Sequence, residues 1–340
     1  MSIYLSHETA LAYWTTRVDE RAVLPAHIVP QALTTADVCD IDDSEAHPEA
    51  VARCRAFMVA CGAWTQEDAP QRQLHIMVSR RGKRGVVENV SYHLGPKVIP
   101  KDAFVCVAPG IYVSSPEYCV LQLANTMTEL HALVEVVCEL CAVYAIGPEG
   151  QGMTGQRFPF TCCQRILDFL DHLSGARGVA RARLAVSHAT DFCFSIMETN
   201  LAVELKLPLE HGGRAFPSFT ANKAIFVDDP SLRGMMGGRK FVRGDIVLDE
   251  LQAVFEYDSY EEHAGKAQLD HTQTRAGVLR SMGYLVISLT YGQVSTNANF
   301  DVAIWMAEEQ IGLQHPKVDH HIRCRQHEVH DFLMQKGRRF

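Results

Sequence analysis

No run of apolar residues in this 340-residue chain is long enough to cross a membrane. The longest candidate, HALVEVVCELCAVYAI, contains Glu135 and Glu139. The start of the chain, MSIYLSHETALAYW, also lacks the charged residues and the unbroken apolar run of a secretion signal, because Ser6, His7 and Glu8 interrupt it. These absences predict a cytoplasmic protein with no membrane partner.

The chain also lacks an excess of positive charge. Its formal net charge of -8 at pH 7 argues against a protein that coats nucleic acid through bulk charge alone. One short segment, SRRGKRG, nevertheless concentrates basic side chains at a turn between two strand-like runs. A phosphate contact and an ordinary solvated turn explain this segment equally well. The candidate DNA contacts here are Arg80, Arg81, Lys83 and Arg84.

Paired metal-binding cysteine motifs are missing as well. The 11 cysteines are odd in number, and no second C-x-x-C accompanies the one formed by Cys138 and Cys141 inside an apolar helical pattern. We therefore predict reduced cysteines in the core, with a zinc or redox role as the minor alternative. Near the C-terminus, His320, Cys324 and His327 share one predicted helix face and could bind zinc. A polar terminal helix is the favoured interpretation there, because no partner pair is evident.

The length and composition favour two domains. With 47% hydrophobic and 21% charged residues, the 340-residue chain can form more than one core. Residues 1–146 mix short helical and strand patterns, which predicts a smaller α+β domain. A glycine-rich break followed by a helical stretch predicts a linker and connector over residues 147–191. Residues 192–340 form the predicted second domain.

Carboxylates interrupt two strand-like runs in this second domain. The runs FVRGDIVL and LQAVFEYD are separated by one acidic pair, so an antiparallel hairpin with a two-residue turn is the simplest prediction. In that register Asp245 lies diagonal to Glu256, with their Cα atoms roughly 7–8 Å apart. Asp258 shares the same face because side chains alternate along a strand. Three acids therefore converge on one side of the predicted hairpin.

The negative charge of three neighbouring carboxylates must be compensated by protons or by positive charge. Neighbouring carboxylates raise one another's pKa, so in a partly buried place they take up protons or bind a cation. Mg²⁺ or Mn²⁺ suits oxygen ligands, lowers the pKa of a bound water and stabilises charge on a phosphate, which is the chemistry of phosphodiester hydrolysis. The structural alternative is that Asp258 ends a strand and that Glu256 reaches solvent or Arg243.

The segments around the hairpin extend the pattern. SIMETNLAVELKL places Ser195 as a helix cap and Glu198 three residues later, an arrangement that could explain Glu198 by capping alone. After the hairpin come His263 and a predicted helix, which Gly283 ends before the strand-like run YLVISLT. The expected order is helix, hairpin, helix, strand.

This stretch, from about Ser195 to Thr290, resembles the PD-(D/E)XK nuclease superfamily, in the branch similar to the very-short-patch-repair (Vsr) endonuclease. The resemblance implies a restriction-endonuclease-like α/β/α sandwich with a mixed sheet. Its motif positions are matched by Glu198, Asp245, Glu256, Asp258, His263, Arg275, Leu279 and Gly283.

The resemblance also implies roles for these residues. Asp245 with Glu256 and Asp258 would hold the Mg²⁺ or Mn²⁺ ion. His263 would assist proton transfer or contact the scissile phosphate, and Glu198 would orient a metal-bound water. These five residues are the implied catalytic set.

Other positions either imply contacts with DNA or depart from the family pattern. Lys266 and Arg275 would contact DNA. The superfamily's usual lysine is replaced by Asp258, as is usual in this branch. Ser259 stands where the branch commonly has glycine, and Thr272 stands where it commonly has aspartate. A non-catalytic DNA-binding regulator that retains the fold is therefore the alternative to an active endonuclease.

Residues 1–146 resemble, less specifically, the AbiEi family of antitoxin and transcription-regulator proteins. LSHETALAYW and APGIYVSSPEYCVLQLA carry this resemblance, and GARGVARARLAV resembles the connector of the same architecture. It implies a phage-defence or toxin–antitoxin context, with DNA as the main partner and a cognate toxin or antitoxin protein as a second partner class. An antitoxin without nuclease activity is a further alternative.

Overall fold

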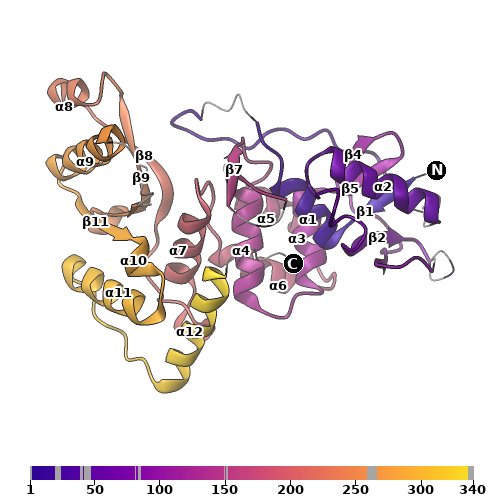
Figure 1. Cartoon of the computed structure of the whole chain (residues 1–340). Coiled ribbons are helices and arrows are strands. Elements are labelled where there is room, and N and C mark those ends of the chain that lie inside the picture. Colours follow the sequence, from indigo (N-terminus) through magenta and orange to yellow (C-terminus); the bar gives the residue numbers. More distant parts are fainter. Residues whose placement is uncertain are drawn as a thin grey trace. The chain divides into compact units, whose positions relative to one another are not determined.

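The computed structural model describes residues 2–19, 24–38, 41, 47–80, 82, 86–148, 150, 152–258 and 266–335, without the side chains of 266–272. These residues form a mixed α/β protein, which confirms the predicted fold class (Figure 1). They divide into two compact units, residues 2–19 with 29–189 and residues 24–28 with 190–335. No helix in these residues is long and apolar enough to cross a membrane.

The first unit is built around a five-stranded mixed sheet of strand order β3-β2-β1-β5-β4. The central strand β1 is fully buried, pairs antiparallel with β2 and runs parallel to β5. The strands of this sheet are β1 (Ile3–Leu5), β2 (Leu74–Val78), β3 (Val90–Leu94), β4 (Phe104–Ala108) and β5 (Ile111–Ser114). The short apolar run at the start of the chain therefore lies at the centre of this unit.

Helices and a hairpin complete the first unit. Ser115 caps the start of α3, because its Oγ accepts a hydrogen bond from the backbone N–H of Tyr118 at 3.3 Å, and Pro116 occupies the first turn. The remaining elements are α1 (His7–Thr15), α2 (Pro48–Ala60), α3 (Pro116–Ala124), α4 (Leu130–Cys141), β6 (Tyr144–Ile146), β7 (Met153–Gln156), α5 (Cys163–Asp171) and α6 (Val179–His188).

The stretch predicted as linker and connector differs from that expectation. β6 and β7 pair antiparallel across the glycine-rich segment, so this segment is the loop of a hairpin. α5 packs against α3 and α6, and α6 also packs against α4. Residues up to 189 consequently belong to the first unit.

The second unit contains a four-stranded sheet of order β11-β10-β9-β8. β9 is antiparallel to both of its neighbours, whereas β10 and β11 are parallel. The strands are β8 (Thr220–Phe226), β9 (Phe241–Leu248), β10 (Ala253–Asp258) and β11 (Leu285–Thr290). The helices are α7 (Ile196–Lys206), α8 (Pro230–Met235), α9 (Lys266–Ser281), α10 (Tyr291–Val294), α11 (Asn297–Ile311) and α12 (His320–Met334).

The β9–β10 hairpin forms, but its predicted turn is wrong. Leu248 pairs with Ala253, so residues 249–252 form the turn, a short 3-10 segment followed by Gln252 with φ of 46°. The register differs from the prediction by two residues, and a shift of two keeps every side chain on the same face. Extended along the strands, this register places Asp245 directly opposite Glu256 rather than diagonal to it.

Helices cover both faces of this sheet, with α9 and α7 on opposite sides (Figure 1). Val278 and Leu279 of α9 pack into one apolar core with Val247 and Val254 of the hairpin. Asp245 and Glu256 lie two residues further along the same strand faces. The core under α9 therefore anchors the strands that carry the acids.

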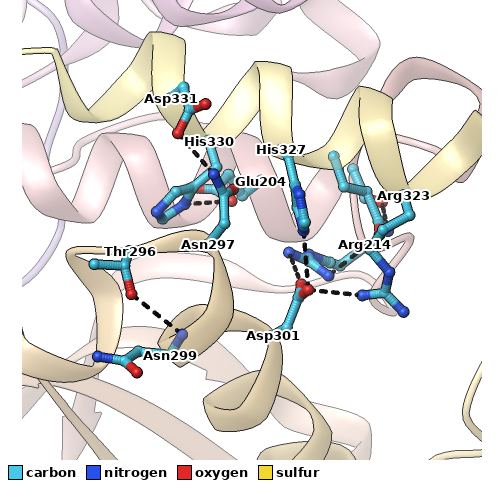
Figure 2. A network of polar contacts seen from close by, with 12 residues as sticks. Glu204, Arg214, Thr296, Asn297, Asn299, Asp301, Arg323, His327, His330 and Asp331 are labelled. Atoms are coloured by element: carbon cyan, nitrogen blue, oxygen red, sulfur yellow. Dashed lines mark hydrogen bonds and ion pairs between the residues drawn. The ribbon is translucent and has the colours of Figure 1, made fainter.

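A polar network fixes α7 from its other side (Figure 2). Glu204 of α7 and His330 of α12 are both buried, and His330 Nδ1 lies 3.0 Å from Glu204 Oε1. On α11, Asp301 forms an ion pair with the buried Arg214 at 2.8 Å and contacts His327 of α12 at 3.0 Å. These contacts hold the helix that carries Glu198 in place.

Candidate active site

Three of the predicted catalytic carboxylates occupy buried positions on three different elements. Glu198 lies in the first turn of α7, Asp245 on β9 and Glu256 on β10, with exposed fractions of 8%, 8% and 3%. Asp258 ends β10 and is half-buried. Burial and, after it, the charge of Asp245 raise the pKa of both Glu198 and Glu256.

Backbone and amide donors orient two of these acids. Asp245 Oδ2 accepts a hydrogen bond from the backbone N–H of Tyr257 at 2.8 Å. Glu198 Oε2 accepts from the backbone N–H of Phe194 at 2.8 Å and from the side-chain amide of Asn222 at 2.5 Å. The carboxylates are therefore held in defined orientations before any ligand binds.

Capping accounts for only part of the position of Glu198. Ser195 Oγ accepts from the backbone N–H of Glu198 at 3.1 Å, as a helix cap does. The Glu198 carboxylate, however, reaches Phe194 and the strand residue Asn222. The contact with β8 is not required for capping, and the charge of Asp245 acts on this carboxylate.

Arg275 of α9 supplies positive charge to this cluster. Its guanidinium forms an ion pair with Glu256 Oε2 and lies 3.8 Å from Asp245 Oδ1. The second oxygen of Glu256, Oε1, is buried without a hydrogen-bond partner among the described residues. A buried carboxylate oxygen without a partner is costly, so this atom marks a place that a cation or a proton would stabilise.

The raised pKa values of these acids indicate that Arg275 compensates their charge only in part. Burial and the neighbouring charge of Asp245 raise the pKa of Glu198 to about 7 and that of Glu256 to about 8. Burial also raises the pKa of Asp245, although Arg275 opposes this shift. Near neutral pH a positive charge placed beside these carboxylates would favour their ionised forms.

The oxygen donors of these acids are of the type that a hard divalent cation prefers, but among the described residues no three of these carboxylates have oxygens within 4.8 Å of one another. Asp245, Glu256 and Glu198 offer carboxylate oxygens, which Mg²⁺ and Mn²⁺ prefer over nitrogen or sulfur. Glu256 Oε1 provides a buried oxygen without a hydrogen bond to lose. Asp258, half-buried at the end of the same strand, can supply a further oxygen.

The remaining predicted site residues lie elsewhere or outside the described part of the chain. Arg80 is exposed in the first unit. Lys266 begins α9, but its side chain is not described. His263, Arg81, Lys83 and Arg84 lie outside the described residues. Their proposed roles stay predictions.

The two zinc alternatives gain little from the geometry. Cys138 and Cys141 are buried on α4 and form no disulfide, and Cys141 Sγ lies within 4.8 Å of Cys163 Sγ at the start of α5. On α12, Cys324 Sγ lies 3.7 Å from His320 Nδ1, while His327 contacts Asp301. A packed core and a polar terminal helix account for these contacts.

Asn222 is the site residue that the sequence did not reveal. It lies on β8, and its φ of 49° is in the left-handed region, which few residues other than glycine adopt. Its neighbours Ala221 and Lys223 pair with β9, but Asn222 does not. Asparagine adopts this region more often than most residues other than glycine, but an asparagine within a strand is not by itself a signal for it.

Comparison with other proteins leaves the family open. The chain matches no protein-family model, no curated protein and no solved structure at a significant level. The resemblances drawn from the motifs therefore enter the functional proposal as proposals.

Proposed function

We propose that the second unit is a Mg²⁺- or Mn²⁺-dependent endonuclease that hydrolyses phosphodiester bonds in DNA. The observation that carries this proposal is the convergence of Glu198, Asp245 and Glu256, buried together with raised pKa values and a carboxylate oxygen that lacks a partner. A purely structural cluster of this kind would cost stability without any compensating role.

Each residue has a defined task in this proposal. Asp245 and Glu256, with Asp258, hold the cation, which lowers the pKa of a bound water and stabilises charge on the phosphate. Glu198, with a pKa of about 7, can accept a proton from the attacking water near neutral pH. Arg275 is partly exposed and can neutralise charge on the phosphate.

DNA as the substrate rests on the resemblance to the Vsr-like branch of the PD-(D/E)XK superfamily. A phage-defence or toxin–antitoxin context rests on the weaker resemblance of residues 1–146 to the AbiEi family. Arg80 and its basic neighbours in the sequence are the proposed additional phosphate contacts.

The test is cleavage of supercoiled plasmid by purified protein with Mg²⁺ or Mn²⁺. We expect nicked or linear product, and a loss of rate of at least about a hundredfold in Asp245→Asn and Glu256→Gln. Asp249→Asn is the matched control, because Asp249 lies in the turn of the same hairpin and pairs with Lys223 outside the cluster. Equal rates in all variants, or cleavage without a divalent ion, would contradict the proposal.

A non-catalytic DNA-binding regulator or antitoxin is the second candidate. The observation in its favour is the ion pair of Arg275 with Glu256, which partly neutralises the cluster without a metal ion. In that case we expect a gel shift of DNA, or capture of a cognate toxin, without cleavage at any concentration of divalent ion. Asp245→Asn would then leave DNA binding unchanged.

A further inference from the structure

Three histidines and one glutamate meet in the first unit, outside the proposed nuclease site. His7 and Glu8 form the start of α1, His75 lies on β2 and His93 on β3. The parallel pairing of β2 and β3 places His93 opposite Met77, the residue two positions after His75. The fold thus brings together residues from three distant parts of the sequence.

The side-chain atoms of this cluster approach one another closely. His75 Nδ1 lies 2.9 Å from His93 Nε2 and 3.0 Å from Glu8 Oε2. The ring of His7 stacks on that of His93, with 3.5 Å between centroids. Glu8 Oε2 is closed off from solvent and makes no well-aligned hydrogen bond among the described residues.

Protons alone do not satisfy this arrangement. His75 Nδ1 carries at most one hydrogen, and it faces both an imidazole nitrogen and a carboxylate oxygen. If this nitrogen is protonated, two acceptors share one hydrogen. If His93 Nε2 donates to it instead, the carboxylate of Glu8 faces a nitrogen lone pair. A metal ion, in contrast, can accept electron pairs from all three atoms once the Glu8 carboxylate moves toward His93, because the three atoms do not yet all lie within 4.8 Å of one another.

His7 is held in a strained position over the cluster. Its φ of 49° is in the left-handed region, its backbone N–H donates to Gln122 Oε1 at 3.1 Å, and its Nδ1 lies 3.0 Å from Ser6 Oγ.

A cavity of about 590 Å³ gives access to this place. His7 and His93 are part of its wall, together with Tyr118 and Gln122 of α3. An ion beside these imidazoles could therefore be reached from the cavity and keep an open coordination position for water or a small ligand.

We propose that Glu8, His75 and His93 bind a first-row transition-metal ion, with Zn²⁺ as the expected occupant and His7 as the adjacent fourth side chain. Two imidazoles and a carboxylate favour such an ion over Mg²⁺. Ligands about 2.1 Å from a tetrahedral ion lie roughly 3.4 Å apart, so binding moves the contacting atoms apart by a few tenths of an ångström and swings Glu8 toward His93.

The experiment titrates chelator-treated full-length protein with Co²⁺, followed by its visible absorption, and with Zn²⁺ in competition with a chromophoric chelator. All proteins carry Asp245→Asn, so that the nuclease-like site does not contribute. We expect one Co²⁺ per chain with the d–d bands of a nitrogen and oxygen site and without thiolate charge-transfer absorption. Glu8→Gln and His75→Ala should each weaken binding at least about tenfold.

His172→Ala is the matched control, because His172 is an exposed histidine of the same unit whose Nδ1 contacts the backbone carbonyl of Asp168 at 2.7 Å. This variant should bind as tightly as the parent. Glu8→Gln keeps the shape of the side chain. If His75→Ala fails to fold, the metal affinity of Glu8→Gln therefore tests the proposed site. Failure to bind either ion, a thiolate spectrum, or unchanged affinity in Glu8→Gln would overturn the proposal.

Discussion

The side-chain amide of Asn222 donates a hydrogen bond of 2.5 Å to Glu198 Oε2, from a backbone in the left-handed region. The carbonyl of the same residue accepts from Arg243 Nη1 at 3.0 Å. Asn222 is the point at which the β8–β9 ladder is interrupted, next to Asp245 of the carboxylate cluster. Backbone strain at such a point persists only where surrounding contacts enforce it, and it is frequent at functional sites.

Two substitutions of Asn222 distinguish the effect of its hydrogen bond to Glu198 from the effect of its strained backbone. Asn222→Ala and Asn222→Gly both remove the amide donor, but only glycine adopts this φ without a penalty. We expect Ala to be less stable than Gly by about 1 kcal/mol in equilibrium urea unfolding. Equal stability of the two variants would show that the backbone conformation of Asn222 is not strained.

The same two variants should change the chemistry of Glu198 alike. Loss of a donor to the charged carboxylate raises its pKa further above about 7. The acidic limb of the rate profile for DNA cleavage should then move to higher pH in both variants. A profile identical to that of the parent would exclude Asn222 as the residue that positions Glu198.

Metal-free protein should lose stability as the pH rises. Glu198 and Glu256 have folded-state pKa values of about 7 and about 8, above the ordinary value of 4.5. The folded state therefore binds more protons than the unfolded state, and their stabilising contribution, complete below pH 4.5, is lost as the pH rises through these values. We expect a decrease on the order of a few kcal/mol, measured by urea unfolding across this range.

Divalent cations should reverse this loss. Mn²⁺ competes with protons for the carboxylates, so the stabilisation that it gives should be larger above pH 8 than below pH 6. At a concentration of 100 times its dissociation constant it would add about 2.7 kcal/mol. Glu256→Gln should flatten the pH dependence and weaken the response to Mn²⁺. A response to Mn²⁺ that is independent of pH would place the bound ion elsewhere.

Removal of the Arg275 side chain should make the stability of the folded protein depend on bound Mn²⁺. In Arg275→Ala the buried Glu256 and its neighbour Asp245 lose their contact with the guanidinium. We expect a loss of about 3 kcal/mol in metal-free protein at neutral pH, largely restored by Mn²⁺. Arg280→Ala, an exposed position on the same helix, is the matched control and should change stability by less than about 0.5 kcal/mol.

The sequence predicted which acids share a face more reliably than it predicted how they pair. Side chains alternate with a period of two, so the two-residue turn and the observed four-residue turn place Asp245 and Glu256 on the same face. The turn length itself was not predictable, because the conformation of Gln252, with φ of 46°, has no signature in an acidic turn sequence.

Long-range partners were beyond the reach of the sequence. Arg275 was predicted to lie on a helix, but its contact with Glu256 depends on how α9 packs across the hairpin. The glycine-rich segment after Ile146 suggested a linker, because glycine is equally frequent in linkers and in hairpin loops. The pairing of Tyr144 with Gln156 across it depends on tertiary packing.

Substitution of Asp301 tests the polar network that supports α7. It contacts Arg214, Arg323 and His327 at 2.8, 3.0 and 3.0 Å, and the Arg214 side chain is buried. Asp301→Ala leaves that guanidinium without its carboxylate, so we expect a loss of about 2–4 kcal/mol in thermal or urea unfolding. Asp331→Ala, which removes an exposed hydrogen bond from Asn297 in the same helix pair, should cost less than about 1 kcal/mol.

The network also carries a consequence for the site. Because Glu204 of α7 binds His330 of α12, loosening α12 should allow α7 and its Glu198 to move. Asp301→Ala should therefore weaken Mn²⁺ binding even at temperatures where the variant is fully folded, whereas Asp331→Ala should not. If Asp301→Ala lowers stability and leaves Mn²⁺ affinity unchanged, the network supports the fold without positioning the carboxylates.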